Sequence, residues 1–255
     1  MVIPVDDDAP LTGNILTWGE WHTIYRRIVA DFGFDSSLDR QARDMLSERI
    51  GSSGLELDDL PSYAGEVVTI AGAAPTLESD LGQIDSPGAV IAASSAAGIC
   101  ESSGVAVDLV VTDLDGDPAR AAAFTHDDIP VVVHAHGDNR RALDEWVSQM
   151  NHAYVFPTTQ TEPRGRVWNV GGFTDGDRAV YLTCALGATR YQFIGWDFED
   201  AGVDPIKKKK LAWAERLLSW LERRQHIHLP VLNDRRNSVD LTDFPDPEQK
   251  SINGP

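Results

Sequence analysis

The positions of apolar residues divide the chain into regions of different periodicity. In the first sixty residues, apolar side chains recur at intervals of three and four, which places them on one face of an α-helix. One such run extends from Trp18 to Ile28, and a second begins after Ser37 and ends before Gly51. The sequence therefore predicts an N-terminal segment of two amphipathic helices, over residues 1–60.

From residue 61 onward, short runs of β-branched and small apolar residues alternate with segments of helical periodicity. The pattern predicts strands over Glu66–Ile70, Ala89–Ala93, Leu109–Thr112, Val131–Val133, Tyr154–Phe156 and Gln192–Ile194. It predicts helices over Thr76–Leu81, Ala96–Ser103, Pro118–His126, Asn139–Met150, Gly176–Leu186 and Ile206–Arg224. Strands that alternate with helices are typical of a parallel sheet. The predicted fold class is therefore α/β, with a doubly wound, mostly parallel, Rossmann-like sheet preceded by the helical leader.

The composition changes again after Pro230, where Asn, Asp, Pro and Ser become frequent. Such a segment has little apolar surface to bury, so we expect a flexible tail over residues 233–255. The predicted α/β catalytic domain then spans residues 61–232.

The chain of 255 residues carries a formal net charge of −18, because 40 acidic residues outnumber 22 basic ones. Only five of the basic residues are Lys, and four of these are consecutive at 207–210. Since 1 M salt screens charges over about 3 Å, an acidic surface poor in Lys favours a halophilic protein; an ordinary acidic cytosolic protein is the alternative. Nucleic acid is excluded as a partner, because phosphate binding needs a basic surface.

Membrane and secreted proteins are also excluded by the sequence. No apolar run approaches the roughly 20 residues of a membrane span. Asp6, Asp7 and Asp8 stand where a signal peptide would carry positive charge. The two cysteines, Cys100 and Cys184, cannot form a disulfide framework. We therefore expect no membrane partner and a cytoplasmic location.

Candidate functional residues follow the predicted strands, because ligands of open parallel sheets gather at the carboxyl ends of the strands. Asp113 and Asp115 follow the third strand, and paired carboxylates suit Mg²⁺ with substrate phosphates. The alternative is a simple Asp-Gly turn in which Asp117 caps the next helix.

The other strand ends carry polar or small residues as well. The turns after the first and second strands contain Gly72, Thr76 and Ser94, which suit phosphate binding at a helix N-terminus but also fit simple tight turns or caps. After the fourth strand come His134, His136, Asp138 and Asn139. These four residues suit hydrogen bonds to a substrate, and a transition-metal site is the alternative.

Three further motifs lie downstream. A glycine-rich loop that opens a helix contains Gly171, Gly172, Thr174, Asp175 and Arg178. Asp197 follows the last strand, and the run Lys207, Lys208, Lys209 and Lys210 opens the last helix. Four adjacent lysines in a chain poor in Lys favour an anionic substrate, and a solvated surface run is the alternative.

These motifs follow one another along the chain as Val-Thr-Asp-Leu-Asp-Gly, His-Ala-His-Gly-Asp-Asn, Gly-Gly-Phe-Thr-Asp-Gly-Asp-Arg-Ala and Ile-Gly-Trp-Asp-Phe, before the Lys run. In this order they resemble the archaeal 6-hydroxymethyl-7,8-dihydropterin pyrophosphokinases, over roughly Glu66 to Leu221. The resemblance implies a fold related to thiamin pyrophosphokinases. It implies transfer of diphosphate from ATP to a reduced pterin, with release of AMP, towards folate or methanopterin coenzymes. The first turn departs from the more glycine-rich turn that the family leads us to expect.

The resemblance and the charges together suggest roles for these residues. We expect Asp113 and Asp115 to hold Mg²⁺, and Asp113 or Asp197 to take a proton if one must be removed. The Lys run and Arg178 would contact phosphates, and the residues after the fourth strand would contact substrate or ribose. The expected partners are small molecules, and a homodimer remains open. The alternatives are a thiamin pyrophosphokinase, a nucleotide-binding module without catalysis, and a sialyltransferase-like protein that binds a sugar nucleotide.

Overall fold

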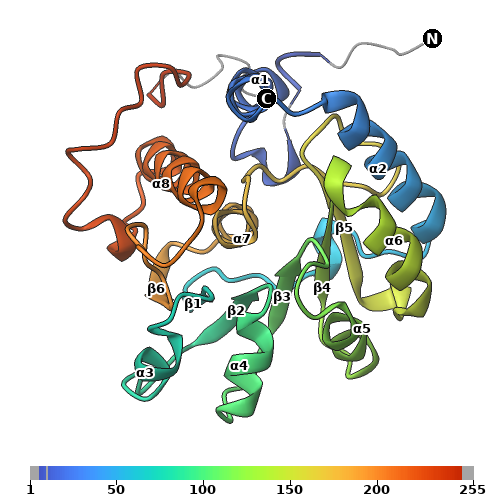
Figure 1. Ribbon diagram of the computed structural model, residues 1–255, viewed down its shortest axis with the longest axis horizontal. Helices are drawn as coiled ribbons and strands as arrows, with labels where there is room; N and C mark the ends of the chain where they lie inside the picture. Colours follow the sequence, from blue (N-terminus) through green and yellow to red (C-terminus); the bar gives the residue numbers. More distant parts are fainter. Residues whose placement is uncertain (1–5, 10, 249–255) are drawn as a thin grey trace.

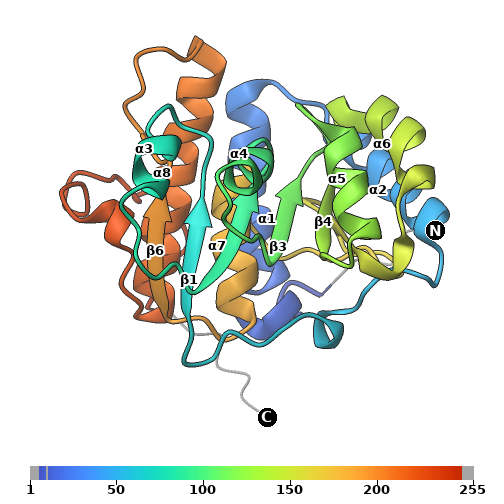
Figure 2. The same cartoon turned by 90° about the horizontal axis from the view of Figure 1, so that it is seen from below.

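A six-stranded parallel sheet forms the centre of the molecule (Figures 1 and 2). The computed structural model describes residues 6–9 and 11–248. The strands are β1 (Val67–Ala71), β2 (Ala89–Ala93), β3 (Leu109–Thr112), β4 (Val131–Ala135), β5 (Val155–Thr159) and β6 (Arg190–Ile194), in the order β5-β4-β3-β2-β1-β6. All neighbouring strands are parallel. The predicted α/β fold with a parallel sheet is confirmed.

Helices cover both faces of this sheet. They are α1 (Trp18–Phe32), α2 (Ser36–Ile50), α3 (Leu77–Leu81), α4 (Ala96–Ser102), α5 (Pro118–His126), α6 (Arg140–Trp146), α7 (Asp175–Ala185) and α8 (Pro205–Gln225). Figure 1 shows α1, α7 and α8 on one side of the sheet, and α3, α4 and α5 on the other. The helix predicted to reach Met150 is shorter than expected, because its last turn is the 3₁₀ turn Val147–Gln149.

Each face of the sheet has its own hydrophobic core, because successive strand residues point to opposite faces. In β1, Ile70 packs with α1, α7 and α8, where Trp21 and Trp220 are fully buried. Ala71, the next residue, packs with the core that includes Leu46 of α2 and helices α4, α5 and α6. The N-terminal helices therefore contribute to the cores of both faces, and the division at residue 60 stays a prediction.

A short connection sets the position of the two N-terminal helices. A capping box between Thr17 and Glu20 begins α1, and Gly33 ends it with a left-handed φ of 69°. Asp35 caps the N-terminus of α2 through the backbone amide of Ser37. The chain thus turns from α1 into α2 within three residues.

The segment from Pro230 to Glu248 packs against α8, whereas the sequence predicts a flexible tail from residue 233. Phe244 is buried against Trp213, and the indole of Trp220 donates a hydrogen bond of 2.8 Å to the carbonyl of Pro245. Leu241 also packs against this core, and Arg236 forms an ion pair of 2.7 Å with Glu222, so apolar and charged contacts together hold the segment against α8. Residues 249–255 of the predicted tail lie outside the described residues. None of the described helices is long and apolar enough to cross a membrane.

Candidate active site

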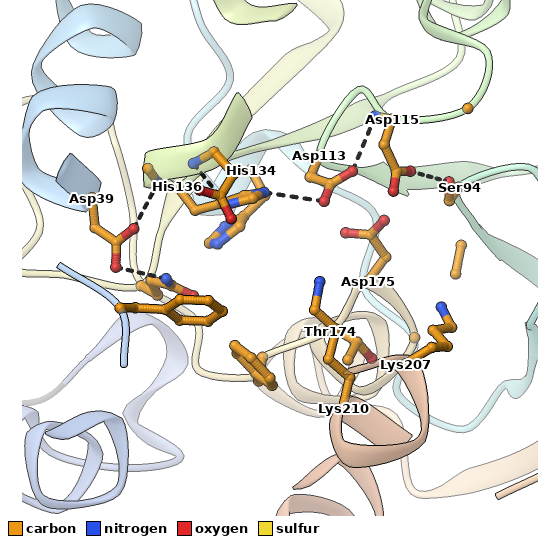
Figure 3. A pocket seen from close by; sticks show the side chains of 18 of the residues that line it. Asp39, Ser94, Asp113, Asp115, His134, His136, Thr174, Asp175, Lys207 and Lys210 are labelled. Atoms are coloured by element: carbon orange, nitrogen blue, oxygen red, sulfur yellow. Dashed lines mark hydrogen bonds and ion pairs between the residues drawn. The ribbon is translucent and has the colours of Figure 1, made fainter. Parts of the chain in front are cut away.

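A cleft of about 370 Å³ lies at the carboxyl ends of the central strands (Figure 3). Residues that directly follow β2, β3, β4 and β5 line it: Ser94, Asp113, His136 and Gln160. The connection between α1 and α2, the start of α7 and the start of α8 form its remaining walls. The structure therefore brings residues from several strand ends together in one site.

Three carboxylates converge in this cleft. Asp113, Asp115 and Asp175 each offer an oxygen, and these oxygens lie within 4.8 Å of one another. The Ser94 hydroxyl donates a hydrogen bond of 3.0 Å to Asp115. Leu114 is buried and has a φ of 65°, a conformation that a branched side chain rarely adopts. The backbone of this loop thus exposes the acid on each side of Leu114 while the leucine packs in the core.

The three carboxyl groups of this cluster have pKa values shifted in different directions. Burial raises the pKa of Asp113, but the hydrogen bond and charge of His136 outweigh it and hold that pKa below its ordinary value. Burial and the charge of Asp113 raise the pKa of both Asp115 and Asp175. A bound cation would favour the ionised form of all three carboxylates, and hard oxygen ligands suit Mg²⁺. The donor set therefore fits a divalent metal ion.

Three residues after β4 form a network around this cluster. The Nε2 atom of His136 lies 3.1 Å from Asp113 Oδ2. Asn139 is buried and donates to the backbone carbonyls of Asp113 and His134, at 2.7 and 2.6 Å, so it positions the two loops. Asp138 also lines the cleft.

Two of the four consecutive lysines face the cleft. Lys207 and Lys210 line it, which fits helical geometry because residues three apart share a face. Lys209 points elsewhere and forms an ion pair of 2.8 Å with Asp31 at the end of α1. Lys208 is exposed and does not line the cleft. The run therefore supplies two cations opposite the acids.

The glycine-rich loop wraps around a buried arginine. Arg178 is 1% exposed and donates to the carbonyls of Gly171, Gly172 and Phe173 at 2.8–3.2 Å. A Cβ at Gly172, whose φ is 80°, would lie 2.5 Å from the Arg178 Cα. Arg178 and both glycines therefore fix the conformation of the loop without lining the cleft themselves. Thr174 lines the cleft and begins α7 by capping.

Gly72, Thr76 and Asp197 lie outside the lining of the cleft. A Cβ at Gly72 would lie 2.5 Å from the Gly195 carbonyl, so glycine is required there for packing between the turns after β1 and β6. Asp197 is exposed and accepts a hydrogen bond of 2.8 Å from the Glu199 amide. None of these three predicted site residues contacts the cleft.

The sequence interpretation missed Phe34, Asp39 and Gln160, which line the cleft. Asp39 lies on the buried face of α2 with Ala42 and Leu46, and an acid on an apolar helical stripe is a signal that could have found it. Gln160 directly follows β5, so inspection of every strand end would have included it. Phe34 has no comparable signal.

The fold and the cleft define a class: α/β proteins that gather acidic residues and lysines at the carboxyl edge of a parallel sheet, where such folds bind ligands. The family model described as "6-hydroxymethylpterin diphosphokinase MptE-like" matches residues 52–202. The chain belongs to this family, and the resemblance inferred from its motifs is confirmed.

Curated relatives support the same assignment. A protein of Methanothermobacter thermautotrophicus named 6-hydroxymethyl-7,8-dihydropterin pyrophosphokinase is 36% identical, over 85% of this chain and 98% of its own length. A protein of the same name from Pyrococcus furiosus is 34% identical, over 81% and 95%. A third from Methanocaldococcus jannaschii is 29% identical, over 82% and 97%.

Proposed function

We propose that this protein is a 6-hydroxymethyl-7,8-dihydropterin pyrophosphokinase that uses ATP and Mg²⁺. The observation that carries the proposal is the placement of three acids, Asp113, Asp115 and Asp175, in one cleft with Lys207 and Lys210. This arrangement suits a polyphosphate with its metal ion. The names of the relatives supply the acceptor.

The proposed reaction forms a bond between the hydroxymethyl oxygen of the pterin and the β-phosphorus of ATP. The bond between the β-phosphorus and the oxygen bridging it to the α-phosphorus breaks, so AMP leaves with that oxygen. The hydroxyl loses its proton. The products are AMP and a pterin diphosphate, which would be an activated intermediate for folate or methanopterin coenzymes.

Positioning and charge neutralisation account for most of the rate in such a transfer. Asp113, Asp115 and Asp175 would hold Mg²⁺, which when bound neutralises phosphate charge. Lys207 and Lys210 would bind the transferred phosphates from the opposite wall. Of the two acids considered for proton removal, only Asp113 lines the cleft.

Incubation of the purified protein with ATP, Mg²⁺ and reduced hydroxymethylpterin tests the proposal. We expect AMP and a diphosphorylated pterin in equal amounts by chromatography. Formation of ADP would reject diphosphate transfer. Transfer to thiamin in place of the pterin would favour a thiamin pyrophosphokinase, and nucleotide binding without any product would favour a binding module.

A further inference from the structure

The cleft extends beyond the acid cluster into a second half, which we call the ring half. It is lined by Phe34, Leu38, Asp39, His134, Gln160 and Phe173. The first three belong to the connection between α1 and α2 and to α2, outside the residues 52–202 matched by the family model. This half combines two phenyl rings with buried polar groups, whereas the acid half holds charged groups.

His134 provides a first buried acceptor in the ring half. His134 is 2% exposed, and the Gln160 side chain lies near its ring, but its Nε2 makes no hydrogen bond of good geometry among the described residues. The Thr158 hydroxyl donates to the carbonyl of Val133 at 3.3 Å, so its oxygen accepts from Nδ1 of His134 at 3.2 Å. With its proton on Nδ1, a neutral imidazole presents Nε2 as an acceptor. A ligand bound in the cleft would supply the donor that this buried acceptor lacks within the protein.

Asp39 provides a second acceptor in the ring half. Its carboxylate accepts hydrogen bonds from the Tyr25 hydroxyl at 2.6 Å, the Gln160 amide at 2.7 Å and the Gly137 backbone amide at 2.7 Å. A carboxylate has about four acceptor positions, so one position remains for a ligand. These three bonds also fix the orientation of the carboxylate.

We propose that the ring half binds the flat heteroaromatic ring of the acceptor substrate by its N–H edge. The ring would donate to His134 and Asp39, and Phe34 and Phe173 would contact its apolar surface. This inference rests on the proposed function, since a pterin carries adjacent N–H donors on its pyrimidine ring. Its hydroxymethyl group lies at the opposite end of the ring system.

The position of the ring half relative to the acids supports this orientation. The rings of His134 and His136 lie 6.0 Å apart, and His136 contacts Asp113. Figure 3 shows His134 between Asp39 and Asp113. A ring held by its N–H edge at Asp39 and His134 would therefore direct its far end, with the hydroxymethyl group, toward the acids.

Direct binding of oxidised 6-hydroxymethylpterin, followed by its own fluorescence without nucleotide, tests the proposal. We expect His134→Phe and Phe34→Ala each to weaken pterin binding by about tenfold or more, and to leave binding of a non-hydrolysable ATP analogue with Mg²⁺ within twofold. The matched control is Asp115→Asn, which should have the opposite pattern. Melting curves confirm folding, and Asp39→Asn is informative only if it folds, because Asp39 also holds three protein donors.

The outcomes separate this proposal from the proposed function. If both His134→Phe and Phe34→Ala bind the pterin as tightly as the wild type, the proposed pterin site in the ring half is wrong, even if the enzyme forms AMP. Failure of the wild type to bind the pterin would overturn it too. Pterin binding that these two substitutions weaken, without any AMP from the wild type, would support the ring half and reject the transferase.

Discussion

The two halves of the cleft are built in different ways. The acid half consists of loops that directly follow the strands of the sheet and of the starts of α7 and α8, so it is a product of the α/β fold itself. The ring half also uses His134 and Gln160 at strand ends, but its other wall, with Phe34 and Asp39, comes from the two helices that precede the first strand and from their connection. In our proposals the sheet provides phosphate chemistry and the added helices provide acceptor selection. The comparison illustrates that function belongs to sites and not to the fold as a whole.

The strongest way to separate the two halves is to neutralise the acids. Asp113→Asn or Asp115→Asn should lower kcat by about 100- to 1,000-fold, because the amide keeps the shape but loses the charge that balances a cation. Pterin affinity should stay as in the wild type. The matched control is Asp117→Asn, in the same loop but outside this cleft, where Asn caps a helix equally well. Near-normal turnover in both acid variants would show that the metal site lies elsewhere.

Single lysine substitutions sharpen the description of the acid half. Lys207→Ala should raise KM for ATP by about tenfold, the equivalent of about 1.4 kcal/mol, because one cation opposite the phosphates is lost. Lys208→Ala should have a smaller effect, since Lys208 does not line the cleft. Steady-state kinetics at saturating pterin measures both. Equal effects would indicate that the run acts through its total charge and not through orientation.

The stability of the metal-free protein should depend on pH through the same acids. A carboxyl whose pKa is raised on folding favours the folded state as it takes up a proton, so these two groups increase stability as pH falls through the raised pKa values of Asp115 and Asp175 to the ordinary value of 3.8. We expect Tm to rise by roughly 2–4 °C for each kcal/mol of added stability in a protein of this size. Mg²⁺ at pH 7 should give a similar rise, and Asp175→Asn should reduce the pH dependence. A Tm unchanged by Mg²⁺ would argue against the cluster as a cation site.

The smallest of these effects concerns salt. With a net charge of −18 and five Lys, Tm should rise between dilute buffer and 1 M KCl, because salt screens repulsion between surface acids. Binding of the ATP analogue should weaken more than binding of the pterin, since the acid half acts by charge and the ring half by shape and hydrogen bonds. A Tm independent of salt would remove the argument for salt adaptation.

The fold was predictable because two periodicities alternate along the chain. All six strands were predicted within three residues of their observed starts and ends, and the polar residues after them identified Ser94, Asp113, Asp115 and His136 as neighbours. Spatial strand order is not encoded in sequence order. The sequence therefore predicts the loop after β6 as part of the site like the other loops, although β6 lies at the edge of the sheet beyond β1 and Asp197 does not line the cleft.

Residues within helices were harder to interpret than residues in loops. The sequence predicts phosphate contacts for the whole Lys run, but a helix turns by about 100° per residue, so of these four only Lys207 and Lys210 line the cleft. Asp39 was hidden by the apolar pattern of α2. Its role depends on Tyr25, Gly137 and Gln160, which are distant in sequence and meet only after folding.

The buried position of Arg178 has a consequence for how the site behaves at different ionic strengths. Its guanidinium is enclosed by the carbonyls of Gly171, Gly172 and Phe173, and its charge acts on Asp175 through the protein interior. Mobile ions screen exposed charges such as Lys207 within about 3 Å in 1 M salt, but they do not enter this interior. The influence of the Arg178 charge on Asp175 should therefore depend little on salt, whereas the contribution of the lysines varies with the salt concentration around the protein.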